Sequence, residues 1–436
     1  MKIRCTNLGT IRKTELDLRP LTVIVGPNNS SKTYLAYSIY GLWRELRSVD
    51  PLLSTLLHAQ LAASGRSTRW RIERLTEALG THVESATRRF EAGLGTFFQD
   101  SSDKLFRRTK FHIDWEPDPQ RLQASLERAS TPTDAALAAP DEPGLADTIV
   151  HDALALTTPF ILPAERNALI ITYKVLSNRR FKLLRDAARV RKPGRRRADE
   201  PREQGEPGDV RYPLPVEDFL DFLADVELVA TRRPRAGKSE FVKLAALLEA
   251  NIQSGNRLEL APTPIGGREL RVGVGDDLSI DLYNASSSIK QLSALVLYLR
   301  YRAAPNQLLI IDEPEMNLHP ASQVRLLEIL AILVRLGVRV LVTTHSPYLM
   351  AHLANLAQRA EDPRIRKKQA AQLYLADPRA LLSDAEVGAY EMRDHRLVSL
   401  KDPEFGLRWD TLSDVFSDLQ QRFFALDGLA HGKPGK

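Results

Sequence analysis

The chain has 436 residues, of which 43% are hydrophobic and 27% charged, and its formal net charge is +6. This composition is ordinary for a globular protein, and the length favours a large core with one or two insertions. No apolar run is long enough to cross a bilayer, and the N-terminal MKIRCTNLGT has no apolar signal segment. The sequence therefore predicts a cytoplasmic protein without membrane contact. Its only cysteine, Cys5, excludes an intramolecular disulfide and a cysteine-based zinc site within one chain.

Residues 2–25 alternate polar and apolar side chains around a turn signal at Gly9, which predicts a hairpin leading into a central strand. Helical spacing begins after residue 33, and residues 51–130 continue mostly helical. Prolines at 131–147 interrupt this α-rich stretch, and TPFILPAER then predicts a short strand that ends in a polar turn.

Residues 166–255 predict a helical insertion, interrupted at 189–211 by a Pro- and Gly-rich stretch of mixed charge. The run RVRKPGRRR at 189–197 has two interpretations, a solvated surface loop or a phosphate-contacting arm. Strand patterns return from residue 256 in RLEL, ELRVGV and LSIDLYNAS. Near the C-terminus we expect a strand at QLYLA and a final helix, WDTLSDVFSDLQQRFFAL. The Phe and Leu spacing of this helix would bury one face against the rest of the protein, which is the preferred interpretation, or against a partner. The expected division is 1–165, 166–255, 256–370 and 371–436.

The segment GPNNSSKT fits the phosphate-loop pattern G-x-x-x-x-G-K-S/T at every position but one. Such a loop surrounds phosphate oxygens with backbone N–H groups, while its lysine supplies an ammonium and its threonine a magnesium-binding hydroxyl. The residues predicted to bind phosphate are Gly26, Asn28, Asn29, Ser30, Ser31, Lys32 and Thr33. Ser31 stands where the pattern has glycine, which is tolerable if its backbone is helical. An ordinary helix N-terminus with small residues remains the alternative.

Two apolar runs end in residues that can perform phosphate chemistry. NQLLIIDEPEMNLHP reads as a strand buried on both faces that ends in Asp312, which can bind Mg²⁺, and Glu313, which can orient and deprotonate a water. RVLVTTHSPYLM reads as a parallel strand that ends near His345, which can contact a γ-phosphate. Taken alone, each segment is also compatible with a structural role, as an acidic turn or a structural histidine.

In NASSSIKQLSALVLYLRY, Ser286, Ser287 and Ser288 precede an amphipathic helix. Hydroxyls and N–H groups at a helix N-terminus suit an anion, but three serines there are also an ordinary N-cap.

The order of these four segments resembles the ATP-binding cassette superfamily in its non-transporter branch, which includes SMC, RecF and OLD-like ATPases. In that resemblance GPNNSSKT matches Walker A, ASSSIKQ the signature motif, LLIIDEPEMNLHP Walker B with its D-loop, and TTHSP the histidine switch. The match covers roughly residues 1–45, 158–170 and 256–352. It implies an α/β fold, an ABC-ATPase head with a mixed central sheet, an antiparallel N-terminal β subdomain and a helical insertion.

The resemblance further implies ATP and Mg²⁺ as cofactors and a head-to-head homodimer that sandwiches two nucleotides. ATP held by Lys32, Thr33 and Asp312 of one copy would be covered by Ser286 of the other, with Glu313 and His345 as catalytic residues. The chain departs from the family in having Ser31 and two further signature serines in place of glycines, which favours slow turnover.

The family's lobe-linking loop carries a glutamine, and the LPAER segment stands at about that place without one. Glu165 and Arg166 are the substitutes that this position offers.

The residues in these motifs resemble those of OLD-like ATPases, which favours an ATPase switch. Its expected role is the sensor component of an anti-phage defence system that acts with a separate effector protein. The alternative is a DNA-repair or chromosome-maintenance ATPase that binds duplex DNA directly. The basic run at 189–197 and the positive net charge are the evidence for it. A nuclease is disfavoured because no D-x-D pair follows residue 352, and a transporter subunit because the signature differs from LSGGQ.

Overall fold

The fold is taken from a computed structural model. It describes residues 1–49, 53–55, 68–100, 102, 104–115, 118–130, 145–156, 158–173, 212–232, 239–262, 268–275, 277–402, 404, 406–408 and 410–430. The basic run predicted at 189–197 lies outside these residues.

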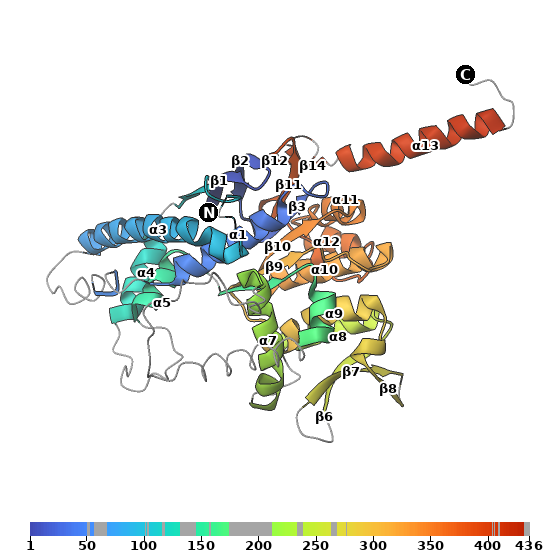
Figure 1. Cartoon of the computed structure of the whole chain (residues 1–436), viewed down its shortest axis with the longest axis horizontal. Helices are drawn as coiled ribbons and strands as arrows, with labels where there is room; N and C mark the ends of the chain where they lie inside the picture. Colours follow the sequence, from blue (N-terminus) through green and yellow to red (C-terminus); the bar gives the residue numbers. More distant parts are fainter. Residues whose placement is uncertain are drawn as a thin grey trace, which may run out of the picture.

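Within the described residues, the strands form one large sheet and two small ones (Figure 1). The large sheet has nine strands in the order β4-β1-β2-β12-β11-β3-β10-β9-β5. Its strands, in chain order, are β1 (Lys2–Leu8), β2 (Ile11–Asp17), β3 (Leu21–Val25), β4 (Lys110–Asp114), β5 (Thr158–Leu162), β9 (Gln307–Asp312), β10 (Arg339–Thr344), β11 (Val387–Arg393) and β12 (Arg396–Ser399). The small sheets consist of β6 (Arg257–Pro262), β7 (Arg268–Val274) and β8 (Leu278–Asp281), and of β13 (Lys401–Asp402) and β14 (Gly406–Leu407).

Strand direction divides the large sheet into two parts. β5, β9, β10, β3 and β11 are neighbours in parallel pairs, so their carboxyl ends meet at one edge, called here the carboxyl edge. β1 pairs antiparallel with both β2 and β4. The mixed α/β fold with N-terminal antiparallel strands that the sequence predicted is therefore confirmed, and both parts belong to one continuous sheet.

The parallel strands are buried on both faces by helices. These helices are α1 (Lys32–Arg47), α3 (Thr68–Phe98), α4 (Pro119–Ser130), α5 (Leu145–Ala153), α7 (Leu214–Arg232), α8 (Glu240–Ile252), α9 (Ser287–Leu297), α10 (Pro320–Arg335) and α11 (Pro347–Leu356). In β9, Leu308 and Ile310 join the core with α1, α3, α4 and α5, whereas Leu309 and Ile311 join the core with α7 to α11. Two-sided burial is the reason why these strands read as continuous apolar runs.

The predicted strand at QLYLA is wrong. This segment follows α12 (Pro363–Ala370) and forms turns and bends. Its backbone N–H groups at Tyr374 and Leu375 donate to the buried carboxylate of Glu328 at 2.9 and 2.7 Å, while His352 contacts the same carboxylate at 2.9 Å. The backbone N–H groups that a strand would donate to its neighbour are thus bonded to the buried carboxyl group of Glu328 instead.

The expected burial of the C-terminal helix is also wrong. α13 (Asp410–Ala430) extends away from the sheets in Figure 1, and its described side chains at 417–427 are all exposed. Phe423 and Phe424 are 63% and 68% exposed. Among the described helices, none is both long and apolar enough to span a bilayer.

Candidate functional site

The segment GPNNSSKT connects β3 to α1 at the carboxyl edge and wraps around its own lysine. Lys32 is only 5% exposed, and its Nζ donates to the carbonyls of Gly26 at 3.0 Å and Pro27 at 2.8 Å. Burial lowers the pKa of Lys32, and the nearby carboxylates of Glu313 and Asp312 act against that shift. Pro27, Asn28 and Asn29 are exposed at the rim of the loop. The lysine is therefore held inside a loop whose outer residues face solvent.

Ser31 does not have the helical backbone conformation in which a serine could replace the glycine of the pattern without strain. Its φ of 65° and ψ of 24° are left-handed, a conformation that favours glycine. Its Oγ accepts a hydrogen bond from the Thr10 N–H at 2.9 Å and lies 2.9 Å from the Thr10 hydroxyl. A side chain at Gly9 would place its Cβ 2.6 Å from this Oγ, so the glycine leaves room for the contact. The condition under which serine would be tolerated here, a helical φ, is therefore not met, and the left-handed Ser31 is instead in contact with Thr10, which is distant in sequence.

The carboxylate of Asp312 lies at the end of β9, beside the first turn of α1. Asp312 is fully buried, and its Oδ1 accepts hydrogen bonds from the hydroxyls of Thr33, at 3.3 Å, and Thr343. Its Oδ2 has no described partner. Burial raises the pKa of Asp312 to about 6. An unpartnered carboxylate oxygen beside a threonine hydroxyl fits Mg²⁺, which prefers oxygen ligands.

Glu313 and His345 directly follow the neighbouring strands β9 and β10, and the His345 ring lies between the Glu313 carboxylate and the Lys32 ammonium. The His345 Nε2 lies 3.0 Å from Glu313 Oε1 and 3.1 Å from Lys32 Nζ. One ring nitrogen cannot donate to the glutamate and accept from the ammonium at the same time. The hydrogen bond with His345 is the main reason why the pKa of Glu313 is lowered, which keeps this carboxylate ionised at neutral pH.

Sequence reasoning missed Glu315. Its Oε1 accepts hydrogen bonds from the Thr344 hydroxyl at 2.7 Å and from the backbone N–H of His345 at 2.6 Å. The second glutamate of the DEPE segment thus fastens the turn after β9 to the turn after β10. A carboxylate two residues beyond Glu313 was the available signal, but its partners come from a distant strand.

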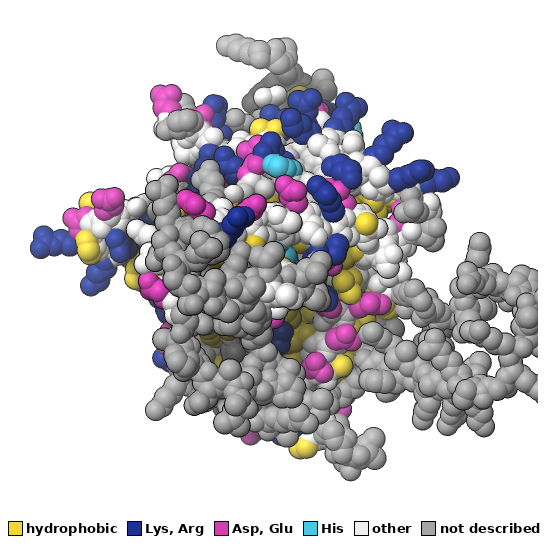
Figure 2. Space-filling view, turned by 90° about the vertical axis from the view of Figure 1, so that its left-hand side faces the viewer, with side chains coloured by type: hydrophobic (Ala, Val, Ile, Leu, Met, Phe, Trp, Pro, Cys, Tyr) yellow, Lys and Arg dark blue, Asp and Glu magenta, His cyan; other side chains and the backbone are white. Residues whose placement is uncertain are grey.

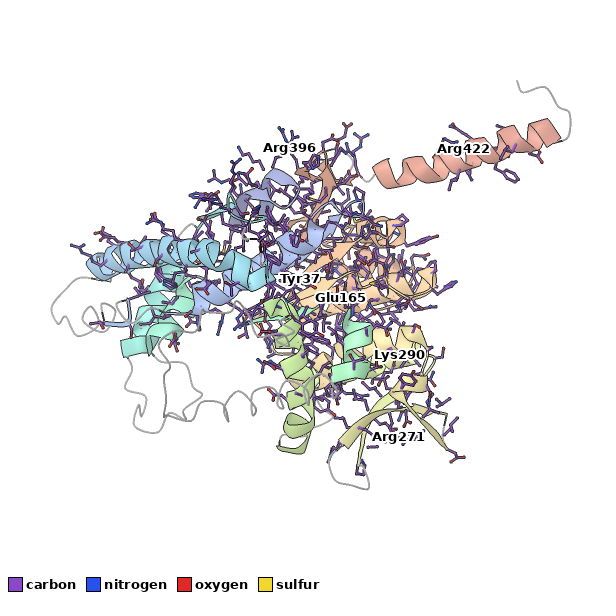
Figure 3. All side chains as sticks on the ribbon, viewed as in Figure 1. Tyr37, Glu165, Arg271, Lys290, Arg396 and Arg422 are labelled. Atoms are coloured by element: carbon purple, nitrogen blue, oxygen red, sulfur yellow. The ribbon has the colours of Figure 1, made fainter. Side chains whose placement is uncertain are left out.

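The LPAER segment brings one of its two predicted residues to the carboxyl edge. Arg166 is buried, and its guanidinium donates to the backbone carbonyls of Asp312 and Glu313 at 2.7 and 3.1 Å. Glu165 is exposed and lies near Tyr37 in the middle of the molecule (Figure 3). Arg166 therefore contacts the backbone of the predicted catalytic and metal-binding residues, whereas Glu165 points to solvent.

The three serines of the signature segment stand at the start of α9. Ser286 caps the helix by accepting a hydrogen bond from the Ile289 N–H at 3.3 Å, and its Oγ lies 2.9 Å from that of Ser288. Ser286 and Ser287 are exposed. Among the described contacts, no hydrogen bond joins these serines to the segment 26–33. Their N-cap role is thus formed within one chain, while their hydroxyls are accessible from outside.

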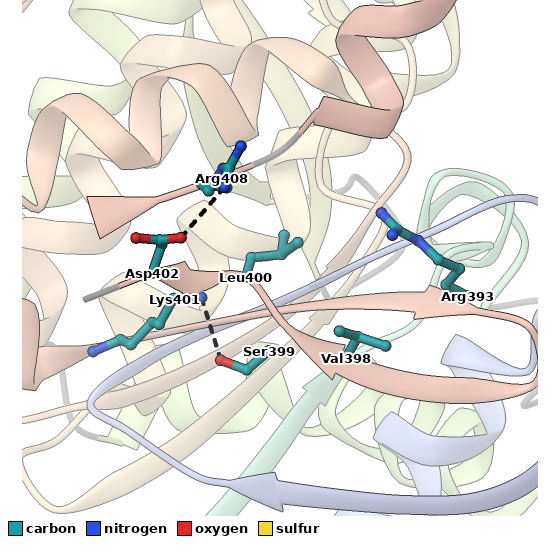
Figure 4. A pocket seen from close by; sticks show the side chains of 7 residues that line it. All are labelled: Arg393, Val398, Ser399, Leu400, Lys401, Asp402 and Arg408. Atoms are coloured by element: carbon teal, nitrogen blue, oxygen red, sulfur yellow. Dashed lines mark hydrogen bonds and ion pairs between the residues drawn. The ribbon is translucent and has the colours of Figure 1, made fainter. Parts of the chain in front are cut away.

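A cavity of about 240 Å³ lies elsewhere, beside the hairpin of β11 and β12 (Figure 4). It is lined by Arg393, Val398, Ser399, Leu400, Lys401, Asp402 and Arg408. None of these residues was predicted to bind a ligand. Each of its three cations pairs with a carboxylate: Arg393 with Glu391, Lys401 with Asp384, and Arg408 with Asp402.

Comparison with known proteins gives one family and several distant structural likenesses. The family model described as "AAA domain, putative AbiEii toxin, Type IV TA system" matches residues 21–351. Similar solved structures include an SmcHead bound to the C-winged helix domain of ScpA, at 14% identity and a TM-score of 0.38, covering 92% of this chain and 96% of that one.

Two further solved structures are similar to the chain at equally low sequence identity. An Smc head domain with an extended coiled coil, bound to the C-terminal domain of ScpA and derived from Pyrococcus furiosus, is 13% identical with a TM-score of 0.37, covering 96% of this chain and 98% of that one. An SMC head domain from Thermotoga maritima is 10% identical with a TM-score of 0.33, covering 91% and 97%. These TM-scores are too low to bear on function. No curated protein matches the chain.

Proposed function

Because the chain belongs to the AAA-domain family whose model spans residues 21–351, we propose that it is a switch protein that binds ATP and hydrolyses it slowly. The observation that carries this proposal is the convergence of Lys32, Asp312, Glu313 and His345 at the carboxyl edge. Residues that follow β3, β9 and β10 contact one another there within 3.3 Å.

In the proposed mechanism the loop at 26–33 binds the phosphates of ATP. Its backbone N–H groups and the N-terminus of α1 face the phosphate oxygens, and Lys32 transfers its donors from loop carbonyls to the β- and γ-phosphates. Thr33 and Asp312 hold Mg²⁺, which neutralises charge on the phosphate oxygens when bound. The phosphates of ATP also separate the Lys32 ammonium from the ring nitrogen of His345. That nitrogen then no longer faces the Lys32 donor and the Glu313 acceptor at the same time.

Glu313 performs the proton chemistry in this mechanism. Its ionised carboxylate orients the attacking water and accepts its proton, and the adjacent His345 contacts the γ-phosphate through an imidazole N–H. Positioning and charge stabilisation provide most of the acceleration in phosphoryl transfer. The departures at Ser31 and the signature serines make a slow switch a better proposal than a fast motor.

We infer further that two copies sandwich two ATP molecules, with Ser286 of each copy covering the nucleotide of the other. The exposed hydroxyls at the start of α9 support this arrangement. ATP then favours the closed dimer because both γ-phosphates are contacted only there, and hydrolysis releases it.

For the biological role we propose the ATPase or sensor component of an anti-phage defence system, located in the cytoplasm, with a separate effector protein. The support is the description of the matching family, which names a toxin of a type IV toxin–antitoxin system. The test is to purify the native complex and measure its mass, protein content and nucleic-acid content with and without ATP. A protein that binds no ATP under these conditions would contradict the whole proposal.

A DNA-repair or chromosome-maintenance ATPase remains the second candidate, and one surface favours it. Arg12, Lys13 and Arg396 are exposed on adjacent strands, and Lys13 is the register partner of Arg396. Lys and Arg side chains also gather along the upper part of the face in Figure 2. Duplex DNA affinity that falls steeply with salt, and falls again in the double variant Arg12→Glu, Arg396→Glu, would support this candidate.

A further inference from the structure

Arg166 is a buried cation without a carboxylate partner among the described ion pairs. It is 2% exposed, and its guanidinium donates to backbone carbonyls of Pro163, Gln291, Asp312 and Glu313 at 2.7 to 3.3 Å. Burial lowers the pKa of Arg166 to about 10, so it stays charged at neutral pH. Burying a cation costs several kcal/mol, which an apolar side chain of similar volume would avoid. The nearby carboxylates of Asp312, Glu315 and Glu313 offset part of this cost, and the forked guanidinium uses its donors on the four carbonyls.

A first role of Arg166 concerns the backbone of Glu313. Its φ of 47° is left-handed, which costs a residue with a side chain about 1 kcal/mol or more. The Glu313 N–H donates to the Thr343 carbonyl at 3.1 Å, and its own carbonyl accepts from Arg166 at 3.1 Å. Both polar groups of this strained residue are thus held, one by β10 and one by the arginine. The direction of the Glu313 carboxylate depends on both contacts.

A second role concerns α9, the helix that begins at the signature serines. Arg166 Nε donates to the carbonyl of Gln291 in this helix at 3.3 Å. The side-chain amide of Gln291 is fully buried, and neither of its polar atoms has a described partner. A buried amide without partners costs about 1–3 kcal/mol per group. A shift of α9 that satisfies this amide would recover that energy, and it would also move the carbonyl to which Arg166 is bonded.

We propose that Arg166 is a positioning residue that couples the signature helix α9 to the catalytic carboxylate of Glu313. Contact of Ser286 with the nucleotide of a second copy displaces α9, and the guanidinium carries that displacement to the carbonyls of Asp312 and Glu313. Hydrolysis is thereby tied to closure of the dimer. This inference rests on the proposed function for its catalytic meaning, but the physical link is present in the nucleotide-free chain.

The test compares Arg166→Lys, which keeps the charge but loses the fork, with Arg166→Met, which keeps the volume but loses the charge. The matched control is Arg300→Lys. Arg300 also donates to a backbone carbonyl, that of Leu258, and pairs with Glu249 at 2.6 Å. It lies in the helical turn Tyr298–Arg302 that continues α9, and it has no described hydrogen bond to Gln291, Asp312 or Glu313. Melting temperature, ATP affinity, kcat and backbone amide hydrogen exchange are measured for each variant.

In the nucleotide-free protein, both Arg166 variants are expected to raise amide exchange at 287–293 and at 312–316 together, which Arg300→Lys does not. With ATP, Arg166→Lys is expected to lower kcat about tenfold or more while ATP affinity stays within about twofold, since displacement of a catalytic group impairs the chemical step. A kcat within about twofold of wild type in both folded Arg166 variants would overturn the coupling. Unchanged amide hydrogen exchange at 287–293 in the Arg166 variants would also overturn the coupling.

Hydrogen exchange needs no turnover, and it separates the two proposals. If the wild-type chain binds and hydrolyses no ATP, the proposed function fails, while exchange that rises in both segments still supports the link through Arg166. If the wild type hydrolyses ATP but exchange in the Arg166 variants rises only near residue 166, the link fails and the proposed function stands.

Discussion

The Ser31 hydroxyl accepts a hydrogen bond from the backbone N–H of Thr10 at 2.9 Å, and this contact fastens the loop at 26–33 to the turn between β1 and β2. The left-handed backbone of Ser31 costs about 1 kcal/mol, and a hydrogen bond of this type returns a similar amount. Thr10 therefore compensates for the residue that replaces glycine in the loop.

From this compensation we expect Thr10→Val to lower ATP affinity about three- to fivefold in the wild-type background, because it removes one of the two contacts to Ser31. In the Ser31→Gly background the same change should have no effect, since neither the strain nor the contact remains. Ser31→Gly alone should be tolerated or should raise kcat. ATP affinities of the four proteins of this double-mutant cycle are the measurement.

Thr6→Val serves as the control for this cycle, because the Thr6 hydroxyl makes no described hydrogen bond. Additive effects of the Thr10 and Ser31 changes would show that the two residues act independently. Complete loss of activity in Ser31→Gly would contradict the assignment of the loop.

Replacement of Lys32 removes the cation that we propose to contact the phosphates of ATP. Lys32→Ala is expected to reduce ATP affinity by about 100-fold or more, because the buried ammonium has no substitute in the loop. Binding of a fluorescent ATP analogue is the readout, with the melting temperature as a check on folding. The exposed Lys368 on α12 offers the control Lys368→Ala, which should bind like wild type. Equal binding by both variants would exclude the loop as the ATP site.

Replacement of the carboxylate that meets His345 separates binding from chemistry. Glu313→Gln should keep ATP affinity while lowering phosphate release about 100-fold or more, because the general base is lost. The unhydrolysed ATP should then hold the protein as a dimer, which native mass measurement detects. The exposed Glu361 supplies the control Glu361→Gln. A Glu313→Gln protein that releases phosphate at the wild-type rate would remove Glu313 from the mechanism.

The buried carboxylate of Asp312 makes metal-free stability depend on pH. Its pKa is about 6 in the folded protein, against the ordinary aspartate value of 3.8 that applies to the unfolded chain, so folding favours the protonated form. That stability is fully present below about pH 4 and is lost as pH rises through about 6. In chelator at pH 7.5, Asp312→Asn should therefore be more stable than wild type, by up to about 3 kcal/mol.

Thermal melting at pH 4 and pH 7.5 tests this prediction, and the advantage of Asp312→Asn should vanish at the lower pH. Glu313→Gln provides a comparison of opposite sign, since the pKa of Glu313 is lowered and its ionised form favours folding. An Asp312→Asn protein that melts below wild type at pH 7.5 in chelator would show that the buried carboxylate is stabilising.

Sequence alone was sufficient for the strands that carry chemistry. β9 and β10 are apolar runs followed at once by Asp312 or by His345, and burial on both faces leaves no ambiguity in such a pattern. β11 was missed because Gly388 and Glu391 interrupt its apolar residues. Glu391 is nevertheless only 6% exposed, since Arg393 pairs with it at 2.7 Å.

Contacts between distant residues account for the rest of what the sequence could not predict. The left-handed backbone of Ser31 is contacted by Thr10, from the turn between β1 and β2, and the buried Arg166 donates to carbonyls of β9 and α9. The exposed face of α13 has the spacing of a buried helix, and periodicity does not reveal whether a partner surface belongs to the same chain.

The position of β11 has a consequence for how the protein is made. β3 leads into the loop at 26–33, and one of its two neighbouring strands is β11, which follows it far along the chain at Val387–Arg393. A ribosome must therefore synthesise the chain through β11 before the strand that precedes the loop can be enclosed. Until then an apolar strand edge remains open on the nascent chain, and early release or truncation before Val387 would leave it open to aggregation.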